Sequence, residues 1–575
     1  MQPQTTSHPQ IDLHPTLLAL LERRGYKGAQ GVAEFLSWDL KRLSDLSELK
    51  DLSKAAQRVV LAVAAGEKIG IYGDYDVDGT TACALLYFFF KMLNIPVELI
   101  QPSRFVEGYG IHPSNIDAAV KRDIKVLITV DCGITAHDAA LRAREVNLDL
   151  IITDHHKEAK EGLPVAFAVI NPNRSDEAPD SPLKSLAGVA VAFCLALEIK
   201  KILEGQGKVI PSLYPLLQFV AIGTICDLAP MTPNNLKLVR HGLKQMADSC
   251  YSGLRSFFTP EERAAGKVLS EKCGFYIGPM INSKGRLEHP EKALELLIAE
   301  DSDRAFLCYN QLDISNRERK MIQAGVFELA REQMIRELEG DDPVASIAYS
   351  ADWHEGVIGI VASKLVDTFK VPAIVFTNAQ EEGLLKGSAR SAGDLNIFEI
   401  LQKLSHHFVR FGGHKAAAGM SLKKENLSAF TQEFKKILRT LPPLLRTESE
   451  TFDLEVKAHE IGAKLARDLE MLEPFGNGNE RPTFRVRDLK IESYELMKDV
   501  HVKWSLVSKS DPTHHLKGVS FNYIGKWQAI HPEEIFKTYA SRPNAAPIID
   551  FELGINRWKG KEFVQLQIKH IQMEC

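Results

Sequence analysis

The sequence lacks the features that mark secreted, membrane and disulfide-stabilised proteins. Its eight cysteines among 575 residues form no Cys-x-x-Cys pair, which argues against a zinc site and against a disulfide framework. The first ten residues, MQPQTTSHPQ, contain neither the basic start nor the apolar core of a secretory signal. The most apolar run, residues 82–90, is far too short to span a bilayer. We therefore expect a cytoplasmic protein with no membrane segment.

No single sign of charge dominates the chain either. Lysine and arginine number 70 against 75 aspartates and glutamates, which gives a net charge of −5. A nucleic-acid ligand would therefore have to meet a local basic channel. The content of 45% apolar and 25% charged residues is ordinary for globular proteins, and we find no repeat or low-complexity tract. A fibre, a coiled-coil rod and long disorder are excluded, and the length predicts several domains.

The hydrophobic pattern divides the chain into five segments. In the second segment, short apolar strands without strict alternation precede helices repeatedly, as in a parallel sheet covered on both faces. The last contains short strands at regular spacing, for which a five-stranded OB-type barrel is our first choice. We predict a helical lead-in at 1–50, a parallel-sheet α/β domain at 51–265, a connector with a long helix at 266–343, a smaller α/β domain at 344–445 and an OB-like β-barrel at 446–575.

Acidic residues and histidines follow the predicted strands of the α/β domain. They are Asp74, Asp76 and Asp78 after the first strand, Asp131 after the second, Asp154, His155 and His156 after the third, and Asp227 after an apolar run. The carboxyl ends of parallel strands face one crevice, so these groups should converge there. A lone aspartate after a strand is more often a helix N-cap, and a lone His-His pair is usually structural. Three consecutive strand ends with the same feature favour a shared ligand instead.

Divalent cations would relieve the repulsion among so many carboxylates. Oxygen ligands with a histidine suit Mn²⁺ or Mg²⁺ better than a thiolate-binding metal. Two ions about 3.5–4 Å apart form a clamp for in-line attack at phosphorus. Gly73 and Gly79 flank the triple-aspartate segment, where we expect them to permit a tight turn. The pattern therefore predicts a two-metal phosphoesterase.

The motifs carry a family resemblance. GDYDVDGTT (73–81), VDCG (130–133), TDHH (153–156) and CDLAP (226–230) resemble, in order, the four acidic motifs of the DHH phosphoesterase superfamily. Within it the chain resembles the RecJ family of single-strand-specific DNA exonucleases. That likeness extends through PSRFVEGYGIHP (102–113), IGPMINSKGRLEHP (277–290), WHEGVIGIVASKL (353–365), GSARS (387–391), FGGHKAAAGM (411–420) and PFGNGNERPTF (474–484). The resemblance implies a DHH catalytic domain, a DHHA1-type second domain and a C-terminal OB-like domain that binds nucleic acid.

The resemblance also assigns roles to residues. The implied metal ligands are Asp74, Asp76, Asp78, Asp131, His155 and Asp227, with Asp131 bridging two ions. The implied catalytic residues are His156, which reaches the scissile phosphate, Asp154, which orients the histidines, and Asp131. The implied substrate-binding residues are Ser388, Arg390, Gly412, Gly413 and His414, followed more weakly by Arg104, Tyr109, Asn282 and Arg286. A guanidinium matches phosphate and a glycine pair exposes backbone N–H groups, which agrees with this assignment.

The implied activity is a Mn²⁺- or Mg²⁺-dependent exonuclease that degrades single-stranded DNA from 5′ to 3′ into mononucleotides, in recombination and repair. We expect a monomer that works with a single-strand-binding protein or a helicase. A narrow cleft between the two α/β domains would select single strands. The barrel aromatics Phe484, Trp504, Phe521, Tyr523 and Trp527 are candidates for base stacking, although a core role suits any one of them better.

Two other functions stay open. The first is a phosphodiesterase on short RNA or on cyclic or linear dinucleotides, which would leave the long C-terminal segment without a use. The second is a scaffold that binds nucleic acid or a replication partner without catalysis. A degenerate scaffold should have lost ligands, whereas none of the implied metal ligands is missing from the sequence.

Overall fold

The structure is a computed structural model of the chain. It describes residues 12–102, 110–287, 291–337, 343–442, 445, 452–524, 530–541, 547–558 and 560–572. The chain forms two compact units. The first comprises Met1–Asn316 with Glu470–Arg481, and the second comprises Arg317–Leu469 with Pro482–Cys575.

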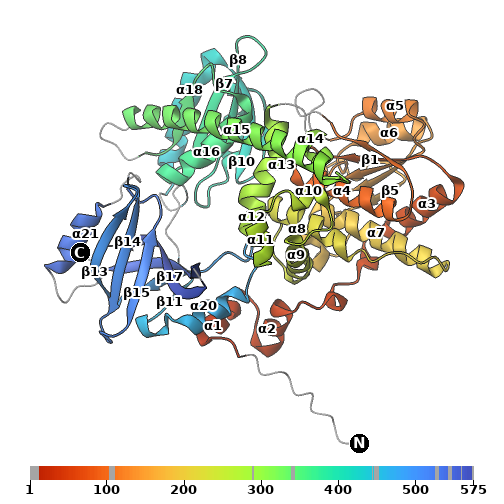
Figure 1. The fold of residues 1–575 in the computed structure, drawn as a ribbon. Helices are drawn as coiled ribbons and strands as arrows, with labels where there is room; N and C mark the ends of the chain where they lie inside the picture. The colour runs from red at the N-terminus through yellow and green to blue at the C-terminus, as the bar shows by residue number, and fades with distance from the viewer. Residues whose placement is uncertain are drawn as a thin grey trace, which may run out of the picture. The chain divides into compact units, whose positions relative to one another are not determined.

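The first unit is built on a parallel five-stranded sheet with the order β2-β1-β3-β4-β5. Its strands are β1 (Ile69–Gly73), β2 (Val97–Ile100), β3 (Val126–Val130), β4 (Asp149–Thr153) and β5 (Ala168–Ile170). Every residue of β1 and β3 is buried, because helices cover both faces of the sheet (Figure 1). The predicted parallel sheet is therefore confirmed, and its central strands β1, β3 and β4 are adjacent.

Two sets of helices cover this sheet. Helices α5 and α6 pack together on one face, where α6 contacts β4, whereas α3, α4 and α7 pack on the other (Figure 1). Helix α4 is apolar almost all round and its residues are nearly all buried, as expected for a helix enclosed by α7, α8 and the sheet. The helices are α3 (Leu52–Ala65), α4 (Val77–Met92), α5 (Pro113–Lys121), α6 (His137–Glu145), α7 (Gly188–Gly205), α8 (Leu217–Cys226) and α9 (Pro233–Met246).

Short helices precede and follow the sheet domain. The lead-in contains α1 (Pro15–Arg23), α2 (Gly28–Leu36), η1 (Leu40–Arg42) and η2 (Leu46–Glu48), and two more single turns are η3 (Pro182–Ser185) and η4 (Tyr214–Leu216). After α9 come α10 (Ser252–Arg255), α11 (Pro260–Ala265), α12 (Ser270–Lys272), η5 (Cys273–Ile277), α13 (Gly278–Leu287), α14 (Glu291–Leu297) and α15 (Ser302–Glu337). The long helix expected in the connector is α15, and the two units divide within it.

The second unit contains a five-stranded mixed sheet with the order β6-β7-β8-β10-β9. Only β6 and β7 pair in parallel. The end of α15 and helix α16 pack on one face, and α17 and α18 pack on the other. The elements are β6 (Ser346–Tyr349), α16 (Glu355–Phe369), β7 (Ala373–Asn378), β8 (Leu384–Arg390), α17 (Ile397–Lys403), η6 (Ser405–His407), β9 (Phe408–Gly413), β10 (Ala417–Lys423), η7 (Lys424–Asn426) and α18 (Leu427–Thr440).

The C-terminal sheet of the second unit has the order β11-β12-β16-β17-β15-β14-β13. Strands β12 and β13 lie toward opposite ends of this order, yet only two residues separate them in the chain, so one continuous stretch, 483–497, closes the sheet on itself. When the stretch 483–497 is counted as one strand, it forms the expected five-stranded barrel together with β14, β15, β16 and β17. Strand β11 is added beside β12. The elements are β11 (Leu454–Glu455), η8 (Ala458–Glu460), α20 (Ala463–Glu470), β12 (Thr483–Val486), β13 (Leu489–Met497), β14 (His501–Ser508), β15 (His515–Ser520), α21 (Pro532–Ala540), β16 (Ile548–Trp558) and β17 (Lys561–Gln572).

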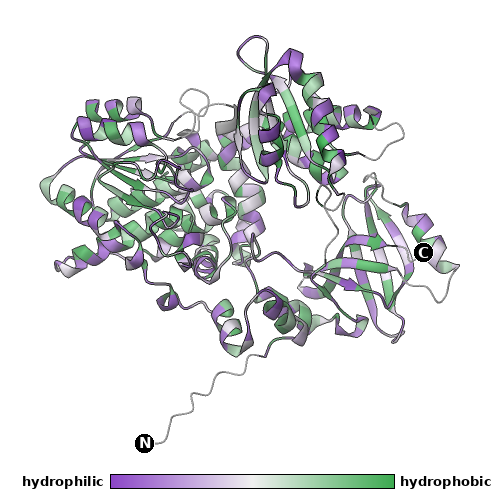
Figure 2. Ribbon diagram, turned by 180° about the vertical axis from the view of Figure 1, so that it is seen from behind, coloured by the Kyte–Doolittle hydropathy of each residue, from purple (hydrophilic) through white to green (hydrophobic). Residues whose placement is uncertain are grey.

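Hydropathy follows this architecture. Figure 2 shows apolar residues concentrated on the strands and on the inner faces of the helices, with polar residues outside. Within the described part of the chain, no helix combines the length and the apolar character needed to cross a membrane.

Candidate metal centre

Three neighbouring strands and two helices deliver the predicted acidic residues to one place. Asp74 follows β1, Asp131 follows β3, and the triplet 154–156 follows β4. Asp76 and Asp78 belong to the start of α4, and Asp227 is the C-cap of α8. Because β1, β3 and β4 are adjacent and parallel, their carboxyl ends meet at one edge of the sheet. The structure therefore gathers all eight side chains that the sequence analysis singled out.

Three sets of ligand atoms lie close enough to hold ions. Each set has donor atoms within 4.8 Å of one another: Asp74 with Asp76 and Asp131, Asp78 with His155 and Asp227, and Asp131 with His155 and His156. The Nε2 atom of His155 lies 3.2 Å from Asp131 Oδ1, 3.7 Å from Asp227 Oδ2 and 3.8 Å from Asp78 Oδ2. Asp131 and His155 each belong to two of the sets, so these two side chains link all three.

Several of these donors are buried without a hydrogen-bond partner. They are Asp74 Oδ1, Asp131 Oδ1 and His155 Nε2. A buried polar atom without a partner is costly, and a divalent cation bound by oxygen and imidazole ligands would satisfy all three. The donor set of this chain therefore fits Mn²⁺ or Mg²⁺.

The raised pKa values of the aspartates in this cluster also favour a bound cation. Burial, and then the charge of Asp76, raises the pKa of Asp74 and of Asp227 to about 7. Burial also raises the pKa of Asp78 and of Asp131 well above the usual range, and neighbouring carboxylates add to both shifts. The fold thus holds carboxylates that resist ionisation unless a cation compensates their charge.

The two histidines differ in protonation. Burial and the neighbouring His156 lower the pKa of His155 to about 4, so its ring is neutral at physiological pH and can act as a ligand. Burial opposes the charge on His156, but the hydrogen bond with Asp154 outweighs it and raises the pKa of His156 to about 9. Asp154 lies 2.8 Å from His156 Nδ1 and also accepts from the backbone N–H groups of His155, His156 and Ile134. Burial works against its charge, yet these bonds hold the pKa of Asp154 below its usual value.

Backbone groups from distant segments hold the ligands in place, and the sequence analysis missed them. Both oxygens of Asp78 accept hydrogen bonds from the start of α7, at 2.6 Å from Gly188 N and 2.9 Å from Val189 N. A Cβ at Gly188 would lie 2.7 Å from Asp131 Oδ1, so only glycine fits there. The sequence signal that could have indicated this contact is a glycine at the start of a long apolar helix.

Asparagines fix the two loops that carry the other ligands. Asn173 Nδ2 donates to the carbonyl of His155 at 2.5 Å, and Asn171 Nδ2 donates to the carbonyl of His156 at 2.9 Å. Asn477, which lies 249 residues beyond Leu228, donates to the carbonyl of Leu228 at 2.7 Å. The carbonyl of Asn477 accepts from Met231 N at 2.7 Å. The GNGN motif therefore supports the loop directly after Asp227.

The two glycines that flank the triple-aspartate segment allow close packing and do not provide a special backbone conformation. Neither Gly73 nor Gly79 has a positive φ, so the short connection from β1 to α4 does not depend on the backbone freedom of glycine. A Cβ at Gly79 would lie 2.5 Å from the carbonyl oxygen of Asp74, and one at Gly73 would lie 2.2 Å from Cys83 Sγ. The residues are small because β1 and α4 approach closely here.

The second unit brings together the residues predicted to bind substrate phosphate. Ser388 pairs in register with Gly419 of β10, which pairs with Gly412 of β9. Arg390 donates from Nη1 to Ser388 Oγ at 3.0 Å, and burial lowers the pKa of this arginine. A Cβ at Gly359 of α16 would lie 2.9 Å from Arg390 Nη2.

The end of the edge strand β9 carries the other predicted phosphate ligands. Gly413 is its last residue and has φ +155°, and the exposed His414 donates its backbone N–H to the carbonyl of Ala417. Ser388 and Arg390 of β8 and Gly412 of β9 therefore lie on the two strands that flank β10 in one sheet, with Gly413 and His414 directly after Gly412.

The weaker substrate candidates and the barrel aromatics mostly lie outside the described residues or are buried. Arg104, Tyr109 and Trp527 lie outside the described residues, as does the side chain of Arg286, whereas Asn282 is half-buried in α13. Phe484, Trp504 and Tyr523 are buried barrel residues, so the core role applies to them. Phe521 is 48% exposed, which leaves it as a described candidate for stacking on a base.

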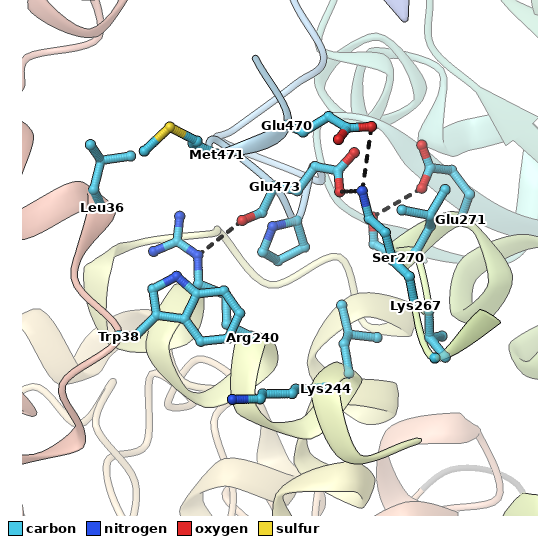
Figure 3. Close-up of a pocket in the computed structure, with 15 residues that line it drawn as sticks. Leu36, Trp38, Arg240, Lys244, Lys267, Ser270, Glu271, Glu470, Met471 and Glu473 are labelled. Atoms are coloured by element: carbon cyan, nitrogen blue, oxygen red, sulfur yellow. Dashed lines mark hydrogen bonds and ion pairs between the residues drawn. The ribbon is translucent and has the colours of Figure 1, made fainter. Parts of the chain in front are cut away.

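A cavity of about 360 Å³ lies elsewhere in the first unit (Figure 3). Leu36, Trp38, Arg240 and Met471 are among its lining residues, and none of the predicted site residues lines it. Lys267 Nζ lies 3.0 Å from Glu473 and 3.5 Å from Glu470 there, and Arg240 Nε donates to the carbonyl of Glu473. Its charged groups thus largely pair with one another.

Comparison with known proteins places the chain. Three family models match it: the DHH family N-terminal domain at residues 68–224, the DHHA1 domain at 342–440 and the RecJ OB domain at 452–570. The single-stranded-DNA-specific exonuclease RecJ of Bacillus subtilis is 34% identical over 97% of this chain and 68% of its own. The exonuclease of the same name from Escherichia coli is 31% identical over 97% of this chain and 96% of its own. The chain belongs to the RecJ family.

Solved structures agree with this membership. RecJ of Thermus thermophilus in complex with Mn²⁺ superposes with a TM-score of 0.76 at 25% identity, covering 97% of this chain and 76% of that one. A second RecJ structure bound to manganese is 31% identical with a TM-score of 0.57 and covers 69% of this chain and 96% of its own. RecJ proteins with this fold thus bind the metal that the donor set of this chain suits.

Proposed function

We propose that this chain is a metal-dependent exonuclease that degrades single-stranded DNA. The observation that carries the proposal is the convergence of buried carboxylates and one neutral imidazole, several of them without a partner, at the carboxyl edge of a parallel sheet. Membership of the RecJ family supplies the substrate class, since the curated relatives are single-stranded-DNA-specific exonucleases.

The proposed metal ligands are Asp74, Asp76, Asp78, Asp131, His155 and Asp227. When bound, two divalent cations supply an activated water and neutralise charge at phosphorus. Asp131, which belongs to two of the donor sets, would hold both ions. The α7 N-terminus fixes the orientation of Asp78 through two backbone N–H groups, and the Asn173 side chain fixes the backbone of His155.

We assign the second histidine of the pair to the substrate. Asp154 holds His156 through Nδ1, which directs the other ring nitrogen toward a ligand. A protonated His156 would donate a hydrogen bond to a non-bridging phosphate oxygen or a proton to the leaving 3′ oxygen. Asp154 positions this ring and does not itself contact substrate.

Residues of the second unit would bind the phosphates of the strand. Arg390 provides a planar guanidinium beside Ser388, which suits a phosphate better than a lysine would. Gly412 and Gly413 end the exposed edge strand β9, and His414 follows directly. The two glycines would let a phosphate approach the backbone closely. A 5′-terminal phosphate bound by this set would give 5′-to-3′ polarity and release mononucleotides. Arg104, Tyr109, Asn282 and Arg286 remain predicted further contacts.

The wider context follows from family membership. We propose a role in recombination and repair, a cytoplasmic location, a monomer, and work beside a single-strand-binding protein or a helicase. The domain bounds that we propose are 1–50, 51–265, 266–343, 344–445 and 446–575, with the last domain holding the strand through its barrel.

The test uses the purified chain with Mn²⁺ and matched DNA substrates. Single strands labelled at the 5′ end should release labelled mononucleotide first, whereas strands labelled at the 3′ end should shorten stepwise, and blunt duplex should resist. Linear and cyclic dinucleotides are the comparison substrates. Faster turnover of a dinucleotide than of a long strand would favour the short-substrate phosphodiesterase, and release of 3′ label first would reverse the polarity.

A further inference from the structure

The second unit contains a cluster of metal-binding side chains that the nuclease chemistry does not use. His406 and His407 end the short helix η6, and Glu433 lies in α18. His407 Nε2 lies 2.8 Å and His406 Nε2 lies 3.2 Å from the same carboxylate oxygen of Glu433. The two imidazole rings are 4.2 Å apart with a tilt of 39°. Three donor atoms from two elements thus converge on one point.

The scaffold fixes the ring of His407 and the helix that carries Glu433. The backbone N–H of His407 donates to the carbonyl of Leu404, and its ring packs edge-on against Phe430, 6.0 Å away. Phe430 and Phe434, on the turns of α18 that flank Glu433, are fully buried. The turns of α18 around Glu433 are therefore anchored in the core, so a ligand would have to order side chains and not the backbone.

An ion from solvent can reach the cluster. The side chains of His406 and Glu433 are 58% and 44% exposed, and that of His407 is 11% exposed. A cation at this point would use all three donor atoms, two imidazole nitrogens and one carboxylate oxygen.

We propose that His406, His407 and Glu433 bind one Zn²⁺ ion. Zinc prefers imidazole nitrogen and carboxylate oxygen at about 2.0–2.2 Å in a tetrahedron, which places its ligand atoms about 3.4 Å apart. The observed spacings of 2.8 and 3.2 Å require only small side-chain movements. Three protein ligands leave one position for water. The sets at the acidic edge of the first unit instead suit harder cations.

The ion would fasten the edge strand of the sheet. Strand β9 begins at Phe408, directly after His407, and pairs with β10 as the edge strand of its sheet among the described residues. It ends at Gly412 and Gly413, which we assign to phosphate binding. Zinc would therefore tie the start of this strand to α18 and raise the stability of the second unit, without taking part in catalysis.

Zinc titration of the full-length protein tests the site. The protein is first saturated with Mn²⁺, so that the acidic centre is filled, and Zn²⁺ is then titrated by calorimetry. His407→Gln and Glu433→Gln should each lose one equivalent of bound zinc, and added Zn²⁺ should raise the melting temperature of the unsubstituted protein only. Mn²⁺-dependent nuclease activity should be unchanged in both variants, since neither residue belongs to the proposed catalytic or substrate site.

A matched control uses another histidine–glutamate pair of the same unit. His515 Nδ1 lies 3.0 Å from Glu492, and both side chains are exposed, but among the described residues this pair belongs to no group of three donor atoms close enough to hold an ion. His515→Gln should keep the full zinc stoichiometry. Cobalt provides an independent readout, because tetrahedral Co²⁺ absorbs visible light strongly, and His406→Gln should abolish that band. Equal zinc binding in the unsubstituted protein and in both ligand variants would overturn the proposal.

Discussion

Two buried aspartates, one in each unit, differ in their surroundings. Asp131 and Asp550 are 1% and 3% exposed. Asp550 accepts two hydrogen bonds of 2.7 Å from Arg485, through Nε and Nη2. Asp131 has a buried oxygen without any hydrogen-bond partner, and carboxylates surround it. A buried carboxylate that is paired within the chain has a structural role, whereas one that is surrounded by other carboxylates and lacks a partner indicates a ligand-binding site.

The sharpest test exchanges each aspartate for asparagine. Asp131→Asn should reduce nuclease activity by about a hundredfold to a thousandfold or more, because the carboxylate shared by two donor sets is lost. The same change should raise the melting temperature of the metal-free protein, since it replaces a carboxyl group whose ionisation is opposed by burial and by the neighbouring carboxylates with a neutral amide. Activity assays and thermal melts with and without Mn²⁺ check both parts.

Asp550→Asn should behave in the opposite way. It leaves Arg485, whose side chain is only 12% exposed, without its full partner, and breaking such a pair costs about 3 kcal/mol of unfolding free energy. Activity per folded molecule should stay near that of the unsubstituted protein. If instead Asp131→Asn destabilised the metal-free protein and spared activity, the distinction between the two aspartates would be wrong.

The pH dependence of the metal-free protein tests the unpaired charges directly. Asp74 and Asp227 have pKa values of about 7 in the fold, against about 4 in an unfolded chain. Because the folded state holds these protons more tightly, their contribution to stability is complete below about pH 4 and is lost as the pH rises through 7.

Denaturant unfolding of the metal-free protein between pH 5 and 8 measures this loss. The free energy of unfolding should fall across the window, and Asp227→Asn should show a shallower fall. Saturating Mn²⁺ should flatten the curve at its upper end, where the ion replaces the protons. Equal slopes for the unsubstituted protein and Asp227→Asn would show that the carboxyl of Asp227 does not resist ionisation.

The sequence predicts the acidic residues of the centre better than the groups that hold them in place. The acidic centre could be predicted because each of its side chains follows a strand or helix locally, and the rule for parallel sheets brings strand ends together. The groups that support it could not, because Gly188, Asn171, Asn173 and Asn477 act through contacts that exist only after folding. The same limit applies to the barrel. The pattern of the stretch 483–497 does not reveal that its two halves, β12 and β13, pair toward opposite ends of one sheet.

Asn477 allows that supporting layer to be tested. Asn477→Ala removes a hydrogen bond to the carbonyl of Leu228 and loosens the loop directly after Asp227. Loss of a group that orients a metal ligand costs about ten- to a hundredfold in metal affinity. Titration of Mn²⁺ should show this weakening, and excess Mn²⁺ should restore activity.

The control for Asn477 is Asn396, whose side chain caps α17 in the second unit. Asn396→Ala should lower stability by about 1 kcal/mol and leave Mn²⁺ affinity unchanged. An equal loss of Mn²⁺ affinity in both variants would mean that Asn477 acts through general stability and not through the Asp227 loop.

The smallest expected effect extends the comparison from charges to aromatic rings. Trp504 is fully buried in the barrel and donates from Nε1 to Ser520 Oγ at 3.0 Å, whereas Phe521 is about half exposed and its ring meets only that of His501 among the described residues. Phe521→Ala should weaken binding of a long single strand by about 1 kcal/mol, roughly fivefold, without changing the melting temperature. Fluorescence anisotropy with long and short oligonucleotides measures it. The loss should appear only with strands long enough to reach the barrel, so an equal loss for the shortest strands would remove Phe521 from the DNA-binding surface.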